Sequence, residues 1–235
     1  MLLDNYYSEQ SNGVHFSRQQ ASAFAKDIAG DFNPIHDHDA KRFCVPGDLL
    51  FSLVLNKYGL SQNMRFLFQG MVTGENAIQF PDTDASTFTL SDDKGKEYLS
   101  VSREGPMTRD LQPITSLTRA YVAFSGQTFP HILVPLMAQH EVMINPERPL
   151  VIYESMVISL DQLTFNNPTL ELNQASLAVD GKRGDAKLQF DIMDGGQRIG
   201  RGEKNMVLSG LRSYEEDKLQ QLVEIYNSRK EGYKA

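Results

Sequence analysis

Asp31 and His36, an aspartate and a histidine five positions apart, are the residues of this chain best placed to do chemistry together. Asn33-Pro34 lies between them, and the proline fixes its own φ angle and disfavours a helical conformation for the asparagine. The two side chains are therefore predicted to project from a short, rigid loop. A carboxylate and an imidazole that converge on one water molecule form a general acid–base pair, because they can differ in protonation state near neutral pH.

The stretch from Gly30 to His36 resembles the signature of the R-specific enoyl-CoA hydratases, also called the MaoC-like or hydratase 2 family. That signature runs Gly-Asp-x-Asn-Pro-aliphatic-His behind an aromatic residue, and here every fixed position is filled, with Phe24 upstream. The alternative interpretation is an ordinary helix end at Gly30, followed by an Asn-Pro turn whose Asp and His are solvated.

The resemblance implies reversible addition of water to a trans-2-enoyl thioester of CoA or of an acyl-carrier protein, in fatty-acid metabolism. Asp31 and His36 would hold the water between them, one taking a proton from it and the other delivering a proton to the substrate. Asn33 would orient the loop or hydrogen-bond the water. The backbone N–H of Gly47, at the start of a helix, would stabilise the negative charge that develops on the thioester carbonyl.

The sequence departs from the family pattern where the central helix begins. Pro46-Gly47-Asp48 replaces a His-Gly-Met-like step, and only ten residues separate His36 from Gly47, which is a short connection for the family. A shortened loop could reshape or close the acyl tunnel, and a carboxylate at Asp48 is unfavourable beside a thioester oxyanion. Two alternatives therefore stay open: a non-catalytic hotdog that binds acyl-CoA or acyl-carrier protein, and a thioesterase.

Helix and strand patterns surround the motif in the order that the family uses. Ser17 with Gln20 predicts a capping box that opens a helix ending at Gly30. An apolar helix enters at Pro46 and is expected to be buried on most sides. Strands are then predicted over residues 64–72, 76–80, 85–90 and 97–101.

The second half is predicted to repeat this order without the motif. Residues 117–124 read as helix or strand, and strands follow over residues 150–160, 175–179, 186–190 and 202–208. The segment 125–131 offers a histidine but no acid, so we expect at most one functional site per chain. Ser213 with Glu216 predicts the cap of a final helix.

The resemblance and these patterns together predict an α+β double hotdog, in which two antiparallel sheets each wrap a central helix and the second half is divergent. The predicted boundaries are 1–112 for the N-terminal hotdog, 113–211 for the degenerate C-terminal one and 212–235 for the final helix. Monomer and homodimer are both open.

Composition excludes several other classes of protein. A net charge of −7 on 235 residues argues against nucleic acid as the main partner. The single cysteine, Cys44, cannot form an internal disulfide, which predicts a reducing, cytoplasmic location. No segment resembles a signal peptide or approaches the roughly 20 apolar residues that span a bilayer, so no membrane association is expected. We expect no metal at His36-Asp37-His38-Asp39, because adjacent residues rarely converge on one ion, and no cofactor beyond the thioester carrier.

Overall fold

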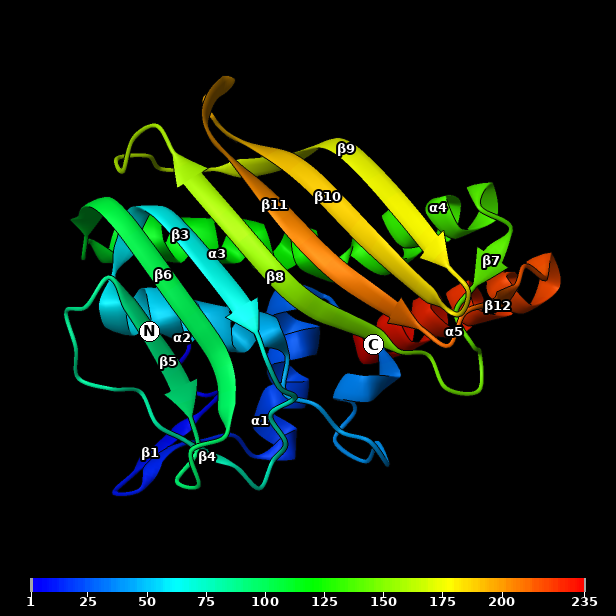
Figure 1. Cartoon of the computed structure of the whole chain (residues 1–235), viewed down its shortest axis with the longest axis horizontal. Coiled ribbons are helices and arrows are strands. Elements are labelled where there is room, and N and C mark those ends of the chain that lie inside the picture. Colours follow the sequence, from blue (N-terminus) through cyan, green and yellow to red (C-terminus); the bar gives the residue numbers. More distant parts are fainter. Residues whose placement is uncertain (1, 235) are drawn as a thin grey trace.

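The computed structural model describes residues 2–234 as a mixed α/β molecule built on one large antiparallel sheet (Figure 1). The predicted combination of helices with antiparallel strands is therefore confirmed. The strand order is β5-β6-β3-β8-β11-β10-β9. The bounds of these strands, in that order, are Thr87–Ser91, Glu97–Thr108, Leu60–Phe68, Val151–Leu160, Gln197–Ser209, Arg183–Asp194 and Thr169–Asp180.

The prediction of two sheets is wrong, because strands of both halves form one continuous sheet. β3 pairs with β8 in antiparallel register, with Phe66 opposite Met156. Joining the halves edge to edge satisfies the backbone groups of two strands that would otherwise be exposed edges.

Two central helices, α2 (Gly47–Tyr58) and α3 (Leu111–Gly126), pack against each other and lie behind the sheet in Figure 1. Every residue of α2 from position 48 to 55 is buried, which confirms the predicted buried helix. The segment 117–124, open between helix and strand, is part of α3. The ring of Phe51 in α2 lies 4.8 Å from that of Tyr121 in α3, so one hydrophobic core links the two halves.

The helix that leads into the motif begins as predicted. α1 (Arg18–Ala23) opens with a complete capping box between Ser17 and Gln20. It continues as a π-helical turn over Phe24–Ala29 and ends at Gly30, whose φ of 63° favours glycine. π-helical turns are rare in proteins, and those that occur often lie at functional sites.

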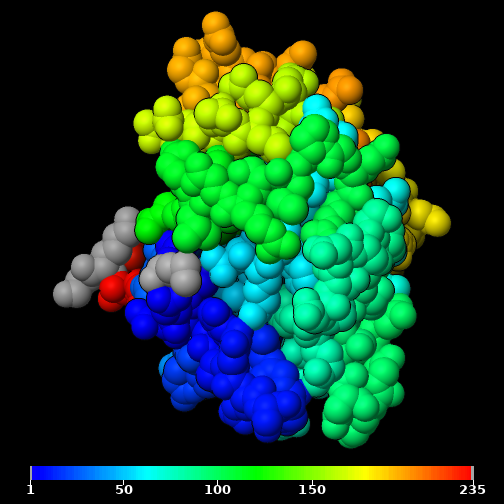
Figure 2. Space-filling view, turned by 90° about the vertical axis from the view of Figure 1, so that its left-hand side faces the viewer, coloured from blue at the N-terminus to red at the C-terminus, as the bar shows by residue number. Residues whose placement is uncertain are grey.

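The remaining elements cover the ends of the sheet. β1 (Ser8–Gln10), β2 (Gly13–His15) and β4 (Ala77–Ile78) form a small sheet; α4 (Val134–Gln139) precedes β7 (Val142–Met143), which pairs with β12 (Arg212–Ser213). Figure 2 shows the blue N-terminal residues beside the green residues of α3. No helix in the described chain is both long and apolar enough to cross a membrane.

The final helix, α5 (Glu216–Lys234), starts later than predicted. Ser213 is a strand residue paired with Val142, so it does not cap the helix. α5 packs beside the motif loop, where the Tyr226 hydroxyl hydrogen-bonds the carbonyl oxygens of Gly30 and Gly126.

Candidate active site

Backbone hydrogen bonds hold the motif loop in a single conformation. The Asp31 N–H donates to the Ala25 carbonyl across the π-helical turn, at 2.8 Å. Asp31 Oδ1 accepts the N–H of Asn33 at 2.9 Å, and Asn33 Oδ1 accepts the N–H of Ile35 at 3.2 Å. Of the two roles predicted for Asn33, its contacts therefore fit loop orientation.

The structure brings Asp31 and His36 together. His36 Nδ1 lies 2.7 Å from the carbonyl oxygen of Cys44. Because a carbonyl can only accept, Nδ1 is the donor, and Nε2 of the neutral ring carries the lone pair. Nε2 faces Asp31 Oδ2 at 3.7 Å, which is longer than a hydrogen bond. The imidazole is thus held by its rear nitrogen and presents its proton-accepting nitrogen beside the carboxylate.

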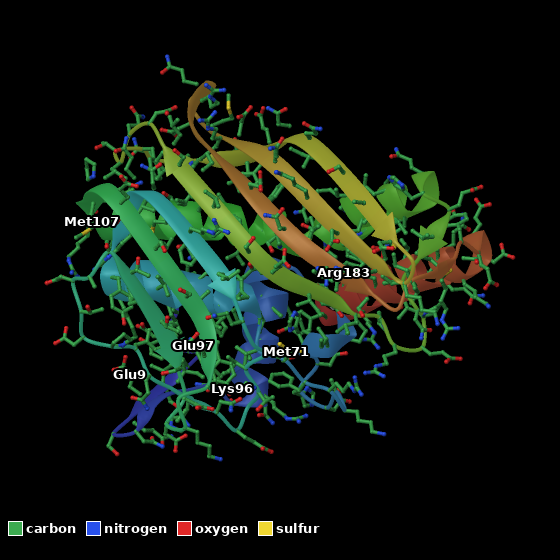
Figure 3. All side chains as sticks on the ribbon, in the orientation of Figure 1. Glu9, Met71, Lys96, Glu97, Met107 and Arg183 are labelled. Carbon is green, nitrogen blue, oxygen red and sulfur yellow. The ribbon has the colours of Figure 1, made fainter. Side chains whose placement is uncertain are left out.

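Both side chains line a cavity of about 370 Å³ between the motif loop, α2, the end of α3 and the strands β8 and β11. The short connection from His36 to Gly47 therefore leaves a cavity open at the motif. Met71, which follows β3, is 39% exposed and is one of the residues that line this cavity; Figure 3 labels its side chain. The lining also includes Asn33, Cys44, Gly47, Asp48, Ser125, Tyr153 and Lys204.

Gly47 lines the cavity, at the start of α2 as predicted. The packing around it gives a structural reason for a residue without a side chain. A Cβ there would come within 3.0 Å of the rings of Phe68 and Tyr153. Those rings stack on each other with centroids 4.3 Å apart. Close packing of these aromatic rings against the backbone therefore favours glycine at this position. The Leu49 N–H donates to the Pro46 carbonyl at 3.0 Å, which leaves the N–H groups of Gly47 and Asp48 as the donors without an acceptor inside α2.

A pair of buried charged residues, Asp48 and Lys204, lies in the same cavity wall. In the part of the chain that the structure describes, they are the only charged residues among the buried ones. Burial raises the pKa of the Asp48 carboxyl, against the opposing effect of Lys204. Burial also lowers the pKa of the Lys204 amine, against the opposing effect of Asp48. Both shifts favour uncharged forms, so Asp48 is less unfavourable beside an oxyanion than its sequence position suggests.

Lys204 and Ser125 are site residues that the sequence interpretation missed. Lys204 Nζ donates to Ser125 Oγ at 2.5 Å, although the two residues are far apart in the chain. A signal was present in β11: Lys204 shares its side of the strand with the buried Met206 and Leu208, and a lysine at an inward strand position is unusual. Ser125 belongs to the motif-less second-half segment, which thus contributes to the same cavity as the motif.

Cys44 and the neighbouring acidic loop do not form further chemical centres. Burial raises the pKa of the Cys44 thiol to about 12, so the sulfur is a protonated thiol near neutral pH. Asp37 pairs with Lys26 at 2.9 Å and with Arg229 at 2.6 Å. Within residues 2–234 no cluster of three metal-ligating side chains occurs.

We expect Tyr226→Phe to lower the free energy of unfolding by about 1–2 kcal/mol, because it removes a hydrogen bond donor from the carbonyls of Gly30 and Gly126. Tyr226 is 4% exposed, so water cannot readily replace its hydroxyl. Tyr233→Phe is the matched control on the same helix. Its hydroxyl donates to Asp27, but it is 47% exposed, so its loss should cost about 0.5 kcal/mol or less. Urea denaturation measures both variants, and equal losses would contradict the anchoring role of Tyr226.

Comparisons with known proteins give one family and several distant structures. The model of a family described as "Protein of unknown function (DUF3581)" matches residues 1–217. Curated protein sequences show no match. An acyl-CoA thioesterase II, TesB2, from Mycobacterium marinum is 10% identical over 72% of this chain and 90% of its own, with a TM-score of 0.43. A tesB protein of Mycobacterium avium subs. paratuberculosis is 8% identical over 70% and 87%, also with a TM-score of 0.43. Similarity at this level assigns neither an activity nor a substrate.

Proposed function

Because the chain belongs to the DUF3581 family, whose description names no activity, we propose one from the cavity itself: hydrolysis of an acyl thioester by a water molecule that Asp31 and His36 activate. The observation that carries this proposal is the orientation of His36. Its Nδ1 is bound to the Cys44 carbonyl and its Nε2 lies beside Asp31 Oδ2, at the wall of a cavity large enough for a small acyl group.

In this reaction His36 Nε2 takes a proton from water while the water oxygen attacks the acyl carbonyl carbon. Asp31 stabilises the imidazolium that forms and helps to orient the water. The carbonyl oxygen becomes negative and is stabilised by backbone N–H groups at the start of α2, near Gly47. The carbon–sulfur bond then breaks, and the thiolate leaves with the proton returned by His36. A thiol has a pKa of about 8.5, so this leaving group needs no strong acid.

The second candidate is hydration of a trans-2-enoyl thioester, which the complete Gly30–His36 signature favours. Hydration also requires one member of the pair to deliver a proton to carbon. Both groups are arranged as proton acceptors: His36 has its lone pair on Nε2, and the Asp31 carboxylate accepts the Asn33 N–H. Neither is arranged to deliver a proton to carbon, and for this reason we place hydrolysis first. Under either reaction we infer a double hotdog, in which each half contributes one central helix and part of the sheet. The domain boundaries after residues 112 and 211 stay a prediction.

Parallel assays with butyryl-CoA and crotonyl-CoA separate these reactions. We expect wild-type protein to release free thiol from butyryl-CoA, measured with a thiol reagent. A hydratase would instead consume only crotonyl-CoA, with loss of the enoyl absorbance and no free thiol. Raised melting temperature with either thioester but no turnover would establish the non-catalytic binder and overturn the proposed activity.

A further inference from the structure

The Lys204–Ser125 contact supplies a nucleophile that the water-activating pair does not use. Ser125 is the penultimate residue of α3, and Lys204 reaches it from β11. Both residues line the cavity that contains Asp31 and His36. A serine hydroxyl is a weak nucleophile unless a base beside it accepts its proton, and a desolvated lysine amine can serve as that base.

The surroundings of Lys204 suit a proton acceptor better than a simple ion pair. None of the ion pairs found among the described residues includes Lys204. Its Nζ lies 4.3 Å from the centre of the Tyr153 ring, and this contact opposes proton acceptance because it favours the charged amine. Asp48 Oδ1 is buried without a hydrogen-bond partner, so Lys204 does not satisfy this oxygen of the carboxyl. Burial also lowers the pKa of the Lys204 amine, which increases the fraction that can accept a proton.

We propose that Ser125 is a nucleophile activated by Lys204, and that thioester hydrolysis passes through an acyl ester on Ser125. Ser125 Oγ attacks the thioester carbonyl carbon while its proton moves to Lys204 Nζ. The carbon–sulfur bond breaks, and the departing thiolate takes that proton from Lys204. The water activated by Asp31 and His36 then attacks the ester, which releases the carboxylic acid and returns a proton to Ser125. This inference rests on the proposed function and assigns the Ser125–Lys204 pair to the first half-reaction and the Asp31–His36 pair to the second.

Intact-protein mass spectrometry after acid quenching of a butyryl-CoA reaction tests the intermediate. We expect a covalent butyryl adduct in His36→Ala, because acylation continues while deacylation is slowed. The double variant His36→Ala/Ser125→Ala should lose the adduct, and His36→Ala/Ser125→Cys should keep it as a thioester. Ser155→Ala, which removes a buried serine that does not line the cavity, is the matched control and should keep the adduct in the same background.

A fluorophosphonate probe tests the nucleophile without any thioester. Wild-type protein should be labelled on Ser125, and Lys204→Met, which keeps most of the alkyl stem, should lower the labelling rate at least about tenfold. If Ser125→Ala hydrolyses butyryl-CoA at the wild-type rate, the serine only bridges buried charges: the inference fails and the proposed function stands. If wild-type protein hydrolyses no thioester and the probe does not label it, both fail. Labelling without hydrolysis would keep the nucleophile and overturn only the thioester substrate.

Discussion

Asp31→Asn and His36→Ala are each expected to lower the rate of thioester hydrolysis by about 10²-fold or more, the usual contribution of a general acid or base. The asparagine keeps the size of the side chain and the oxygen that accepts the Asn33 N–H, but it removes the negative charge beside His36 Nε2. The alanine removes Nε2, the ring nitrogen of His36 that is not bound to the Cys44 carbonyl and can take a proton from water. Steady-state release of free thiol from butyryl-CoA measures both losses.

Two substitutions in the same loop are matched controls. His38→Ala and Asp39→Asn repeat the chemical changes at exposed side chains that do not line the cavity. We expect both to keep turnover within about threefold of wild type and to leave the melting temperature unchanged, as surface substitutions usually do. Wild-type turnover in either Asp31→Asn or His36→Ala would remove that residue from the mechanism, and equal losses in the controls would attribute the effect to the loop as a whole.

Gly126→Ala is expected to lower the free energy of unfolding by about 3 kcal/mol or more, the range of severe overpacking. A Cβ at this position would lie 1.9 Å from the carbonyl oxygen of Ala29 and 2.7 Å from its carbonyl carbon. These are backbone atoms, so no side-chain rotation can relieve the clash. Either α3 or the π-helical turn before the motif must move, and Asp31 would move with that turn. Chemical denaturation measures the stability loss.

Gly232→Ala is the control for this experiment. Gly232 lies in α5 with no atom within 4 Å of an added Cβ, so alanine there should stabilise the helix by up to about 1 kcal/mol. Hydrolysis by the surviving folded fraction of Gly126→Ala should also fall, because the clash displaces the backbone that holds Asp31. A Gly126→Ala protein with wild-type stability would show that α3 and the motif do not approach each other as described.

Local sequence signals predicted the parts of the site that depend on neighbouring residues. The capping box at Ser17, the helix end at Gly30 and the Asn33-Pro34 turn are set by backbone preferences within a few residues. These preferences were sufficient to predict a short, rigid loop that carries Asp31 and His36, while their convergence on one water was what the family resemblance implied. The apolar helix after Pro46 was equally clear, because its hydrophobic residues occur on every face.

Strand pairing was harder to predict from the sequence. The alternation of apolar and polar residues indicates which segments form strands, but not which strands pair with each other. β9 and β10 each extend well beyond the apolar cores predicted for them, because their outer residues face solvent and carry polar side chains. The β3–β8 pairing that unites the sheet joins segments about 90 residues apart, and no local preference selects it.

The sequence by itself determined the motif loop, the positions of Asp31 and His36 on it, and the buried helix beside it, because short-range sterics and hydrogen bonds decide those features. Only the tertiary structure decided that Lys204 of β11 and Ser125 of α3 join them in one cavity, and that α5 packs beside the motif. These contacts depend on how distant surfaces pack to exclude water, and each residue's own neighbours in the chain carry little information about that arrangement.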